Sequence, residues 1–159
     1  KIKIFIENHM KVVIQRVKSA SVQINQKLKS KIEMGFLVFI GICVDDTKSD
    51  AEWLVNKILN LRIFNDKQGV MNESLIDVNG EILIISQFTL MALTKKGNRP
   101  SYIRSAPHKI AIPLYEHFVE LFKARINDNV KTGVFGADME IKLVNDGPVT
   151  ILIDTKNKE

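Results

Sequence analysis

The feature that most constrains the fold is an uncharged, largely apolar run, FLVFIGICV, from Phe36 to Val44. It is far shorter than the roughly 20 apolar residues of a membrane-spanning helix, and no other window reaches that length. A continuous apolar run of this size is typical of a strand that is buried on both faces. We therefore expect no membrane partner and a sheet whose central strand includes this run.

Other segments predict further strands around it. Apolar stretches at 12–17, 21–24, 139–144 and 149–154 have the length and composition of strands. Lys27, Lys29 and Lys31 alternate along one more strand and so share a face, where a solvated edge is favoured over RNA contact. Residues 62–72 predict a strand, a turn and a short strand, and Asn79-Gly80 predicts a hairpin leading into residues 81–90.

Two helices complete the predicted elements. Ser49 and Glu52 fit the S-x-x-E capping box of a helix that ends near Leu61. A second helix contains residues 114–125 and can start as early as Ser105, with a break or kink expected near Pro113. The 159 residues therefore predict one α/β domain with more strand than helix.

A basic segment follows the last predicted central strand. The net charge is +5, which favours an anionic partner. No Asp or Glu interrupts the stretch from Lys95 to Lys109, and residues 94–107 lack the periodicity of a helix or strand. Long loops in compact domains are commonly functional, so RNA contact is favoured here over a solvated charge run.

Most of the usual catalytic equipment is missing from the sequence. His9, His108 and His117 form no metal-binding pair and Cys43 has no neighbouring cysteine, so we expect neither a metal site nor a cofactor. The glycine-bearing segment 133–138 lacks dinucleotide-binding spacing, and there is no nucleophile elbow. Cys43 is expected to be a buried small apolar side chain, and any catalysis must use the backbone, a hydroxyl, an amide or the substrate.

The segment SQFTL, residues 86–90, turns polar directly after the apolar residues 82–85. Ser86 and Thr89 offer hydroxyls, Gln87 offers a donor and an acceptor, and the backbone N–H groups could face a developing oxyanion. The alternative is a plain strand end whose hydroxyls cap turns, which the pattern alone favours.

The second motif is NDGPVT, residues 145–150, between two predicted strands. It encodes a simple turn well. Its Gly-Pro bond could also be cis, as in about 5–6% of such bonds in folded proteins, and would then present a rigid pair of carbonyls.

SQFTL and NDGPVT, with QRV at 15–17 and GNRPSY at 97–102, together resemble the D-aminoacyl-tRNA deacylase family in order and spacing. The resemblance covers residues 10–154 and implies a strand-rich α/β domain with β-barrel-like sheets and two main helices. Residues 1–9 fall outside it as an N-terminal extension or a remnant of cloning, and 155–159 form a polar tail.

The resemblance implies hydrolysis of the ester that joins a D-amino acid to the 3′-terminal adenosine of tRNA, a proofreading step of translation in the cytoplasm. Glycine mischarged on alanine tRNA is an implied second substrate. The reaction would be RNA-assisted, with the adenosine 2′-hydroxyl helping to activate water and a backbone oxyanion hole. The implied catalytic residues are Ser86, Gln87, Phe88 and Thr89.

The resemblance further implies a homodimer with active sites at its interface. Gly147 and Pro148, joined by a cis bond, would enter the partner subunit's pocket and reject L-aminoacyl groups, while Arg16 braces their loop. The implied tRNA-binding residues are Lys95, Lys96, Arg99, Pro100 and Arg104. DNA is not an expected partner.

Two alternatives to this enzyme stay open. A non-catalytic tRNA-binding module on the same fold would need only the basic segment. A general esterase using Thr89 would cleave simple esters without RNA.

Overall fold

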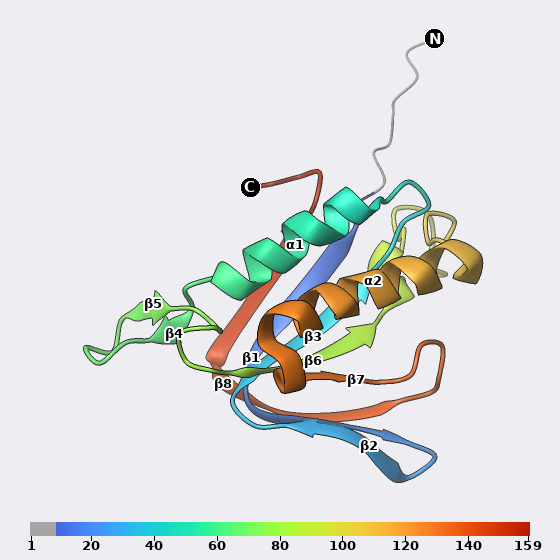
Figure 1. The fold of residues 1–159 in the computed structure, drawn as a ribbon. Coiled ribbons are helices and arrows are strands. Elements are labelled where there is room, and N and C mark those ends of the chain that lie inside the picture. The colour runs from blue at the N-terminus through green and yellow to red at the C-terminus, as the bar shows by residue number, and fades with distance from the viewer. Residues whose placement is uncertain (1–8) are drawn as a thin grey trace.

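The computed structural model describes residues 9–159 and centres on one six-stranded sheet (Figure 1). Strands β2, β1, β3, β6 and β7 follow one another in that order, and β8 pairs with β1. The β3–β6 and β6–β7 pairs are parallel, and the others are antiparallel. The strands of this sheet are β1 (Lys11–Ile24), β2 (Lys27–Ile32), β3 (Gly35–Gly41), β6 (Glu81–Ser86), β7 (Val130–Thr132) and β8 (Glu140–Asp154).

The helices α1 (Lys48–Asn60) and α2 (His108–Ile126) lie side by side on one face of this sheet (Figure 1). The larger core fills the space between the two helices and the sheet and includes Phe36, Leu54 and Phe118, all fully buried. A smaller core around Leu37 and Leu83 lies on the other face, where the sheet curls into a partly closed barrel. The predicted strand-rich α/β domain with barrel-like sheets and two main helices is confirmed.

Strand β3 confirms the central buried strand, although it ends at Gly41 and not at Val44. Six of its seven residues are buried, because β1 and β6 flank it and both faces are covered. The segment that continues the run leaves the sheet, and Cys43 instead pairs with Ser105 in an isolated bridge. The basic segment is thereby tied to the end of β3.

Two long strands replace four predicted short ones. Residues 12–17 and 21–24 belong to one strand, β1, which pairs first with β3 and then with β2. Residues 139–154 were expected to form two strands around a turn, but β8 runs from Glu140 to Asp154. Both halves of β8 keep pairing with β1, so the NDGPVT segment is absorbed as a bulge and reverses nothing.

The predicted hairpin at Asn79-Gly80 is wrong. Asn79 does adopt a turn conformation with φ of +49°. However, the strand that follows it, β6, pairs in parallel with β3, and the strand before it, β5 (Met71–Glu73), pairs with β4 (Phe64–Asn65). The strand, turn and short strand expected within 62–72 are therefore confirmed as the β4–β5 hairpin, and the turn at Asn79 only connects it to the main sheet.

The helix ends also differ from the prediction. The capping box of α1 is formed by Thr47, whose backbone N–H donates to the Asp50 carboxylate at 2.8 Å, because the same spacing occurs two residues before Ser49. Helix α2 continues through Pro113 without the expected break. Pro113 is exposed, so water can take the carbonyl that loses its partner.

The structure describes the predicted C-terminal tail but little of the predicted N-terminal extension. Of the predicted N-terminal extension, only His9 lies within the described residues. The predicted polar tail begins with a buried residue, Thr155, whose backbone N–H donates to the Met10 carbonyl at 3.0 Å. Across residues 9–159, no helix has the length and apolar character needed to cross a membrane.

Candidate active site

The polar residues of SQFTL lie where β6 ends. Residues Ile82 to Ile85 are buried between β3 and β7, and the last ladder bond runs from the Gln87 N–H to the Ile40 carbonyl at 2.7 Å. Beyond it the chain turns into a short 3-10 helix, η1 (Phe88–Met91). The N–H groups of Phe88 and Thr89 open this helix and have no acceptor within it, so they form a small cluster of donors.

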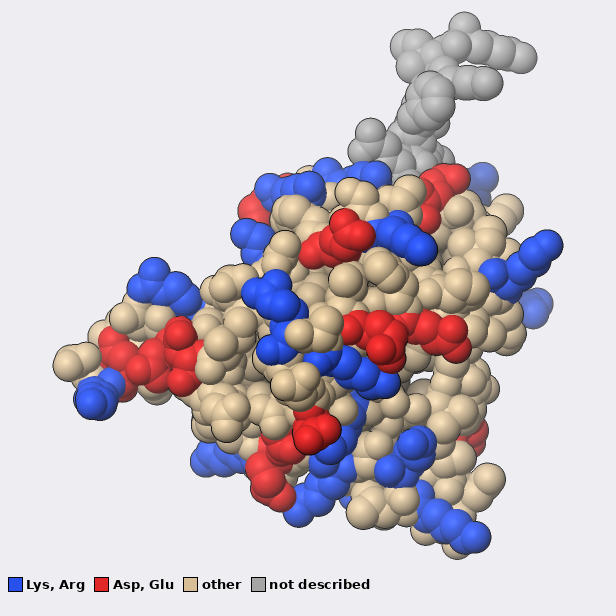
Figure 2. All heavy atoms as spheres, in the orientation of Figure 1, with Lys and Arg blue, Asp and Glu red and all other residues tan. Residues whose placement is uncertain are grey.

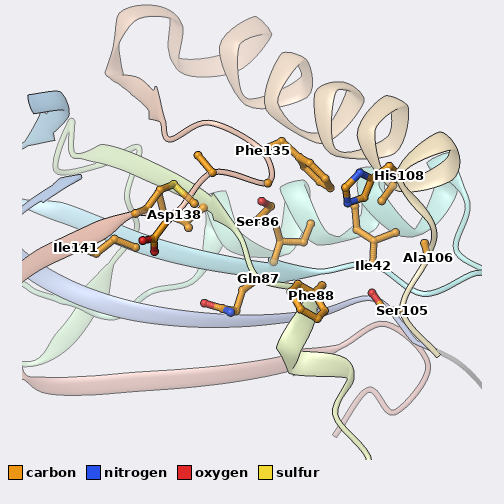
Figure 3. A pocket seen from close by; sticks show the side chains of 16 residues that line it. Ile42, Ser86, Gln87, Phe88, Ser105, Ala106, His108, Phe135, Asp138 and Ile141 are labelled. Carbon is orange, nitrogen blue, oxygen red and sulfur yellow. The ribbon is translucent and has the colours of Figure 1, made fainter. Parts of the chain in front are cut away.

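A cavity of about 460 Å³ lies beside this strand end, which we call the β6 pocket (Figure 3). Ser86, Gln87 and Phe88 line it from β6 and η1. Helix α2 contributes His108. The far wall is the segment that connects β7 to β8, with Phe135, Gly136, Ala137, Asp138 and Met139. The lining of the pocket therefore combines apolar side chains with a hydroxyl, an amide and backbone groups.

Helix α2 is fixed against the strand that ends at the pocket. The Tyr115 hydroxyl donates to the Ile84 carbonyl at 3.0 Å. Burial raises the pKa of this hydroxyl above its ordinary value, so it stays protonated and keeps donating. The rings of His108 and Tyr115 both contact Phe135 edge-on, at 5.5 and 5.6 Å between centroids. This packing joins the helix to the far wall of the pocket.

Thr89 stands next to the pocket and is half-buried, but it does not line the cavity. Its hydroxyl oxygen accepts a hydrogen bond from the Gln87 side-chain amide at 2.5 Å. An amide N–H cannot take up a proton, so this contact does not activate the hydroxyl as a nucleophile.

Cys43 and His117, which could in principle be reactive, lie in surroundings typical of structural residues. Cys43 is buried, and burial raises the pKa of its thiol to about 11, so it is not a thiolate at neutral pH. His117 lies on α2 with its Nε2 3.7 Å from a Glu52 carboxylate oxygen on α1, as a structural histidine would. Among residues 9–159, no three His, Cys, Asp or Glu side chains gather in a metal-binding arrangement.

Gly147 and Pro148 lie elsewhere, in the bulge of β8. In the β1–β8 ladder Gln15 pairs with Thr150 and Val17 pairs with Asn145, so residues 146–149 together face Arg16 alone. The bond between Gly147 and Pro148 is cis, and Gly147 has a φ of +121°. Neither residue lines the β6 pocket of its own chain. We call residues 146–149 the Gly-Pro bulge.

Arg16 anchors the Gly-Pro bulge through side-chain contacts with Asp146. Its side chain is only 6% exposed. The Nε atom donates to the Asp146 carbonyl at 3.1 Å and lies 3.4 Å from the Asp146 carboxylate, while Nη1 donates to the Ile63 carbonyl at 2.5 Å. The guanidinium thus connects the bulge to the chain between α1 and the β4–β5 hairpin.

The basic segment, residues 94–107, forms an irregular loop from η1 to α2, as expected, and we call it the basic loop. Lys95, Lys96, Arg99 and Pro100 are exposed, whereas Arg104 is half-buried. Figure 2 shows Lys and Arg interspersed with Asp and Glu over the visible face of the molecule. Net charge alone therefore does not mark an RNA surface, and the local absence of acids in the basic loop carries more weight.

Comparison with known proteins places the chain in a family. The model of a family described as D-Tyr-tRNA(Tyr) deacylase matches residues 13–154. The chain belongs to this family. A D-aminoacyl-tRNA deacylase of Flavobacterium psychrophilum is 59% identical over 150 residues, which cover 94% of this chain and 100% of the relative. One of Bacteroides fragilis is 57% identical with the same coverage.

Two solved structures have the same fold as this member of the deacylase family. The c-Myc DNA unwinding element binding protein superposes with a TM-score of 0.86 at 42% identity, covering 90% of this chain and 97% of that one. A probable eukaryotic D-amino acid tRNA deacylase gives a TM-score of 0.80 over 92% and 99% of the two chains. At 19% identity, the second likeness concerns the fold alone. The predicted family and the predicted class of enzyme, a hydrolase of aminoacyl esters, are confirmed.

The structure brings together part of the predicted site. Ser86, Gln87 and Phe88 meet in the β6 pocket, and the Thr89 N–H belongs to the same turn. Gly147 and Pro148 lie with Arg16 outside that pocket. The far wall from Phe135 to Met139 is not predicted from the sequence, because the segment 133–138 matches no dinucleotide-binding spacing or other known motif. Its two glycines next to an aromatic could have indicated a pocket-lining loop.

Proposed function

We propose that this chain hydrolyses the ester between a D-amino acid and the 3′-terminal adenosine of tRNA. The observation that carries the proposal is the β6 pocket, a cavity of about 460 Å³ that Ser86 and Gln87 line. The unpaired N–H donors that open η1, those of Phe88 and Thr89, follow these two residues directly. In a protein of the deacylase family, such a cavity can accept the nucleoside and its aminoacyl group.

The proposed chemistry uses the backbone and the substrate. The N–H groups of Phe88 and Thr89 stabilise the oxyanion that forms when water attacks the ester carbonyl. The adenosine 2′-hydroxyl helps to activate that water, while Ser86 and Gln87 position the ribose and the adenine. This division of labour is supported by the surroundings of Thr89, whose hydroxyl meets an amide and no base.

The proposed selector comes from a second copy of the chain. Gly147 and Pro148 of the partner enter the pocket, and their carbonyls leave no room for the side chain of an L-aminoacyl group. The proposal is supported by β8, which pairs only with β1 among the described strands and exposes Leu152 at 74% and Val144 at 52%. A long edge strand with exposed apolar side chains is a ready surface for dimerisation.

Two finer points belong to the same proposal. Glycine has no side chain to reject, so glycine mischarged on alanine tRNA is a second substrate. The enzyme acts in the cytoplasm, where aminoacyl-tRNA is found, and works without a metal or other cofactor.

Paired deacylation of D-tyrosyl-tRNA and L-tyrosyl-tRNA in the presence of a chelator tests the function. We expect rapid loss of the D-ester while the L-ester is spared, and cleavage of glycyl-tRNA charged on alanine tRNA. Cleavage of both tyrosyl esters would contradict the selector. Survival of both would favour the non-catalytic tRNA-binding module, and cleavage of simple esters would favour the general esterase.

Replacing Thr89 with alanine should leave kcat for D-tyrosyl-tRNA within about threefold, because the backbone N–H survives the change. Single-turnover deacylation measures this directly. Thr89→Ser is the matched control, since a nucleophilic mechanism would survive with serine and fail with alanine. Complete loss of turnover in a folded Thr89→Ala protein, with activity kept in Thr89→Ser, would contradict the RNA-assisted mechanism.

Replacing Lys95, Lys96 and Arg99 together with alanine should raise KM for tRNA and weaken its salt dependence. Loss of three phosphate contacts would reduce the slope of log KM against log salt by about two to three. The triple variant of Lys27, Lys29 and Lys31 is the matched control, because it removes the same charge from exposed positions on β2. An equal effect of both variants would mean that only net charge matters.

A further inference from the structure

Beside the β6 pocket lies a group of exposed apolar side chains to which the proposed chemistry gives no role. Phe88 is 56% exposed, Tyr102 38% and Ile103 81%. The Phe88 and Tyr102 rings meet edge to face at 5.0 Å between centroids, and both residues stay partly exposed. We call these three residues the rim platform. Exposed apolar side chains grouped in this way mark a binding surface more often than single ones do.

Two of the three residues of the rim platform, Tyr102 and Ile103, lie on the basic loop, and backbone hydrogen bonds fix the loop on both sides of them. Leu93 and Ser101 exchange two backbone hydrogen bonds of 2.8 and 3.0 Å directly before Tyr102. The Ser105 N–H then donates to the Tyr102 carbonyl at 2.9 Å, and the Ala106 N–H donates to Ile42 at 2.9 Å. The backbone that carries Tyr102 and Ile103 therefore needs little ordering when a partner binds, which favours affinity.

The position of the rim platform points to its occupant. Phe88 belongs both to the platform and to the wall of the β6 pocket (Figure 3). Ser105, which follows Tyr102 and Ile103 along the chain, lines the same pocket. A polynucleotide whose last nucleoside sits in the pocket must leave it across some part of the rim. The exposed cations Lys95, Lys96 and Arg99 lie in the loop closed by the Leu93–Ser101 bridge, where a sugar-phosphate backbone could follow them.

We propose that the rim platform stacks on the unpaired nucleobase that directly precedes the terminal adenosine of the tRNA. Base stacking on aromatic side chains next to a basic track is the general way in which proteins hold single-stranded nucleic acid without reading its sequence. The surface then serves every tRNA alike, because the aromatic face accepts any base. This inference rests on the proposed function and extends the substrate contact by one nucleotide.

The test compares two substrates that differ in this nucleotide. D-tyrosyl-tRNA has a base at the penultimate position, and D-tyrosyl-adenosine has none. Tyr102→Leu keeps apolar bulk but removes the ring, so the ratio of kcat/KM for tRNA to kcat/KM for the adenosine ester should fall about tenfold. Tyr102→Phe should keep the wild-type ratio. An unchanged ratio in Tyr102→Leu would overturn the inference.

A tRNA with an abasic penultimate residue separates stacking from other effects. With the wild type, the abasic tRNA should have a kcat/KM about tenfold below that of the intact tRNA. With Tyr102→Leu, the abasic tRNA should lose no further activity, because both changes remove the same stacking contact. Independent, additive losses would overturn the inference. A binding readout needs no turnover: 2-aminopurine at that position of uncharged tRNA should be quenched by the wild type and not by Tyr102→Leu.

Two outcomes separate this inference from its neighbours. If the wild type hydrolyses neither D-ester yet quenches 2-aminopurine in a Tyr102-dependent way, the proposed function fails and the stacking surface stands. If Tyr102→Leu changes the sedimentation of the free protein from that of the wild type, the rim platform belongs to a contact between copies of the chain, and the inference is overturned.

Discussion

Replacing Gly147 with alanine should lower kcat/KM for D-tyrosyl-tRNA about 100-fold, as a displacement of about 1 Å in a positioning group can. A Cβ on this residue would lie 3.0 Å from the Arg16 Nη2 atom and 3.0 Å from a Val149 methyl carbon. The φ of +121° is also one that side chains with a Cβ rarely adopt. The bulge must therefore shift, and with it the carbonyls proposed to enter the partner's pocket.

Gly69→Ala is the matched control for this change. Gly69 also has a positive φ, of +79°, but a Cβ there would meet nothing within 4 Å. Gly69→Ala should lose about 1–2 kcal/mol of folding free energy through its backbone conformation. Gly147→Ala should lose more because of its close contacts, and only this variant should lose activity on the D-ester. Unfolding in denaturant and single-turnover deacylation measure the two effects separately. Wild-type turnover and unchanged preference for the D-ester in Gly147→Ala would contradict the selector.

The central part of the fold could be predicted from local pattern. The apolar run at 36–44 had to be buried on both faces, and the helical periodicity around α1 and α2 required an apolar partner surface. The pairing of the strands could not be predicted in the same way. Asn79-Gly80 has ideal hairpin chemistry, but β3 gives β6 a largely buried parallel neighbour, which a local turn signal cannot reveal.

The same limit explains the site. The polar end of β6 was visible as a change of composition at Ser86, and the pocket formed there. The role of residues 145–150 as a bulge was not visible, because Asn-Asp-Gly-Pro is equally good turn chemistry. Only the long register between β1 and β8 distinguishes the two, by placing Arg16 opposite residues 146–149. The far wall at Phe135 depends on the packing of α2, which no short motif encodes.

Replacing Arg16 with methionine should cost about 3 kcal/mol of folding free energy and remove most discrimination between D- and L-esters. The change keeps the apolar volume of the side chain but leaves two carbonyls, of Ile63 and Asp146, without their donor. The Asp146 carboxylate loses its cation as well. Because Asp146 directly precedes Gly147, an unanchored bulge should occupy many positions. Denaturant unfolding and the ratio of D- to L-tyrosyl-tRNA deacylation rates check the two parts.

Arg62→Met is the matched control, since Arg62 also donates to a backbone carbonyl, that of Asn72, at 2.8 Å but in an exposed position. It should change stability by less than about 1 kcal/mol and leave the D to L ratio intact. Arg16→Lys separates charge from geometry: an ammonium can pair with Asp146, but it lacks the planar fork that reaches both carbonyls. If Arg16→Lys restores stability but not discrimination, the guanidinium positions the bulge. If Arg16→Met keeps full discrimination, the bulge holds its shape through the β1–β8 ladder alone, and Arg16 has no part in selection.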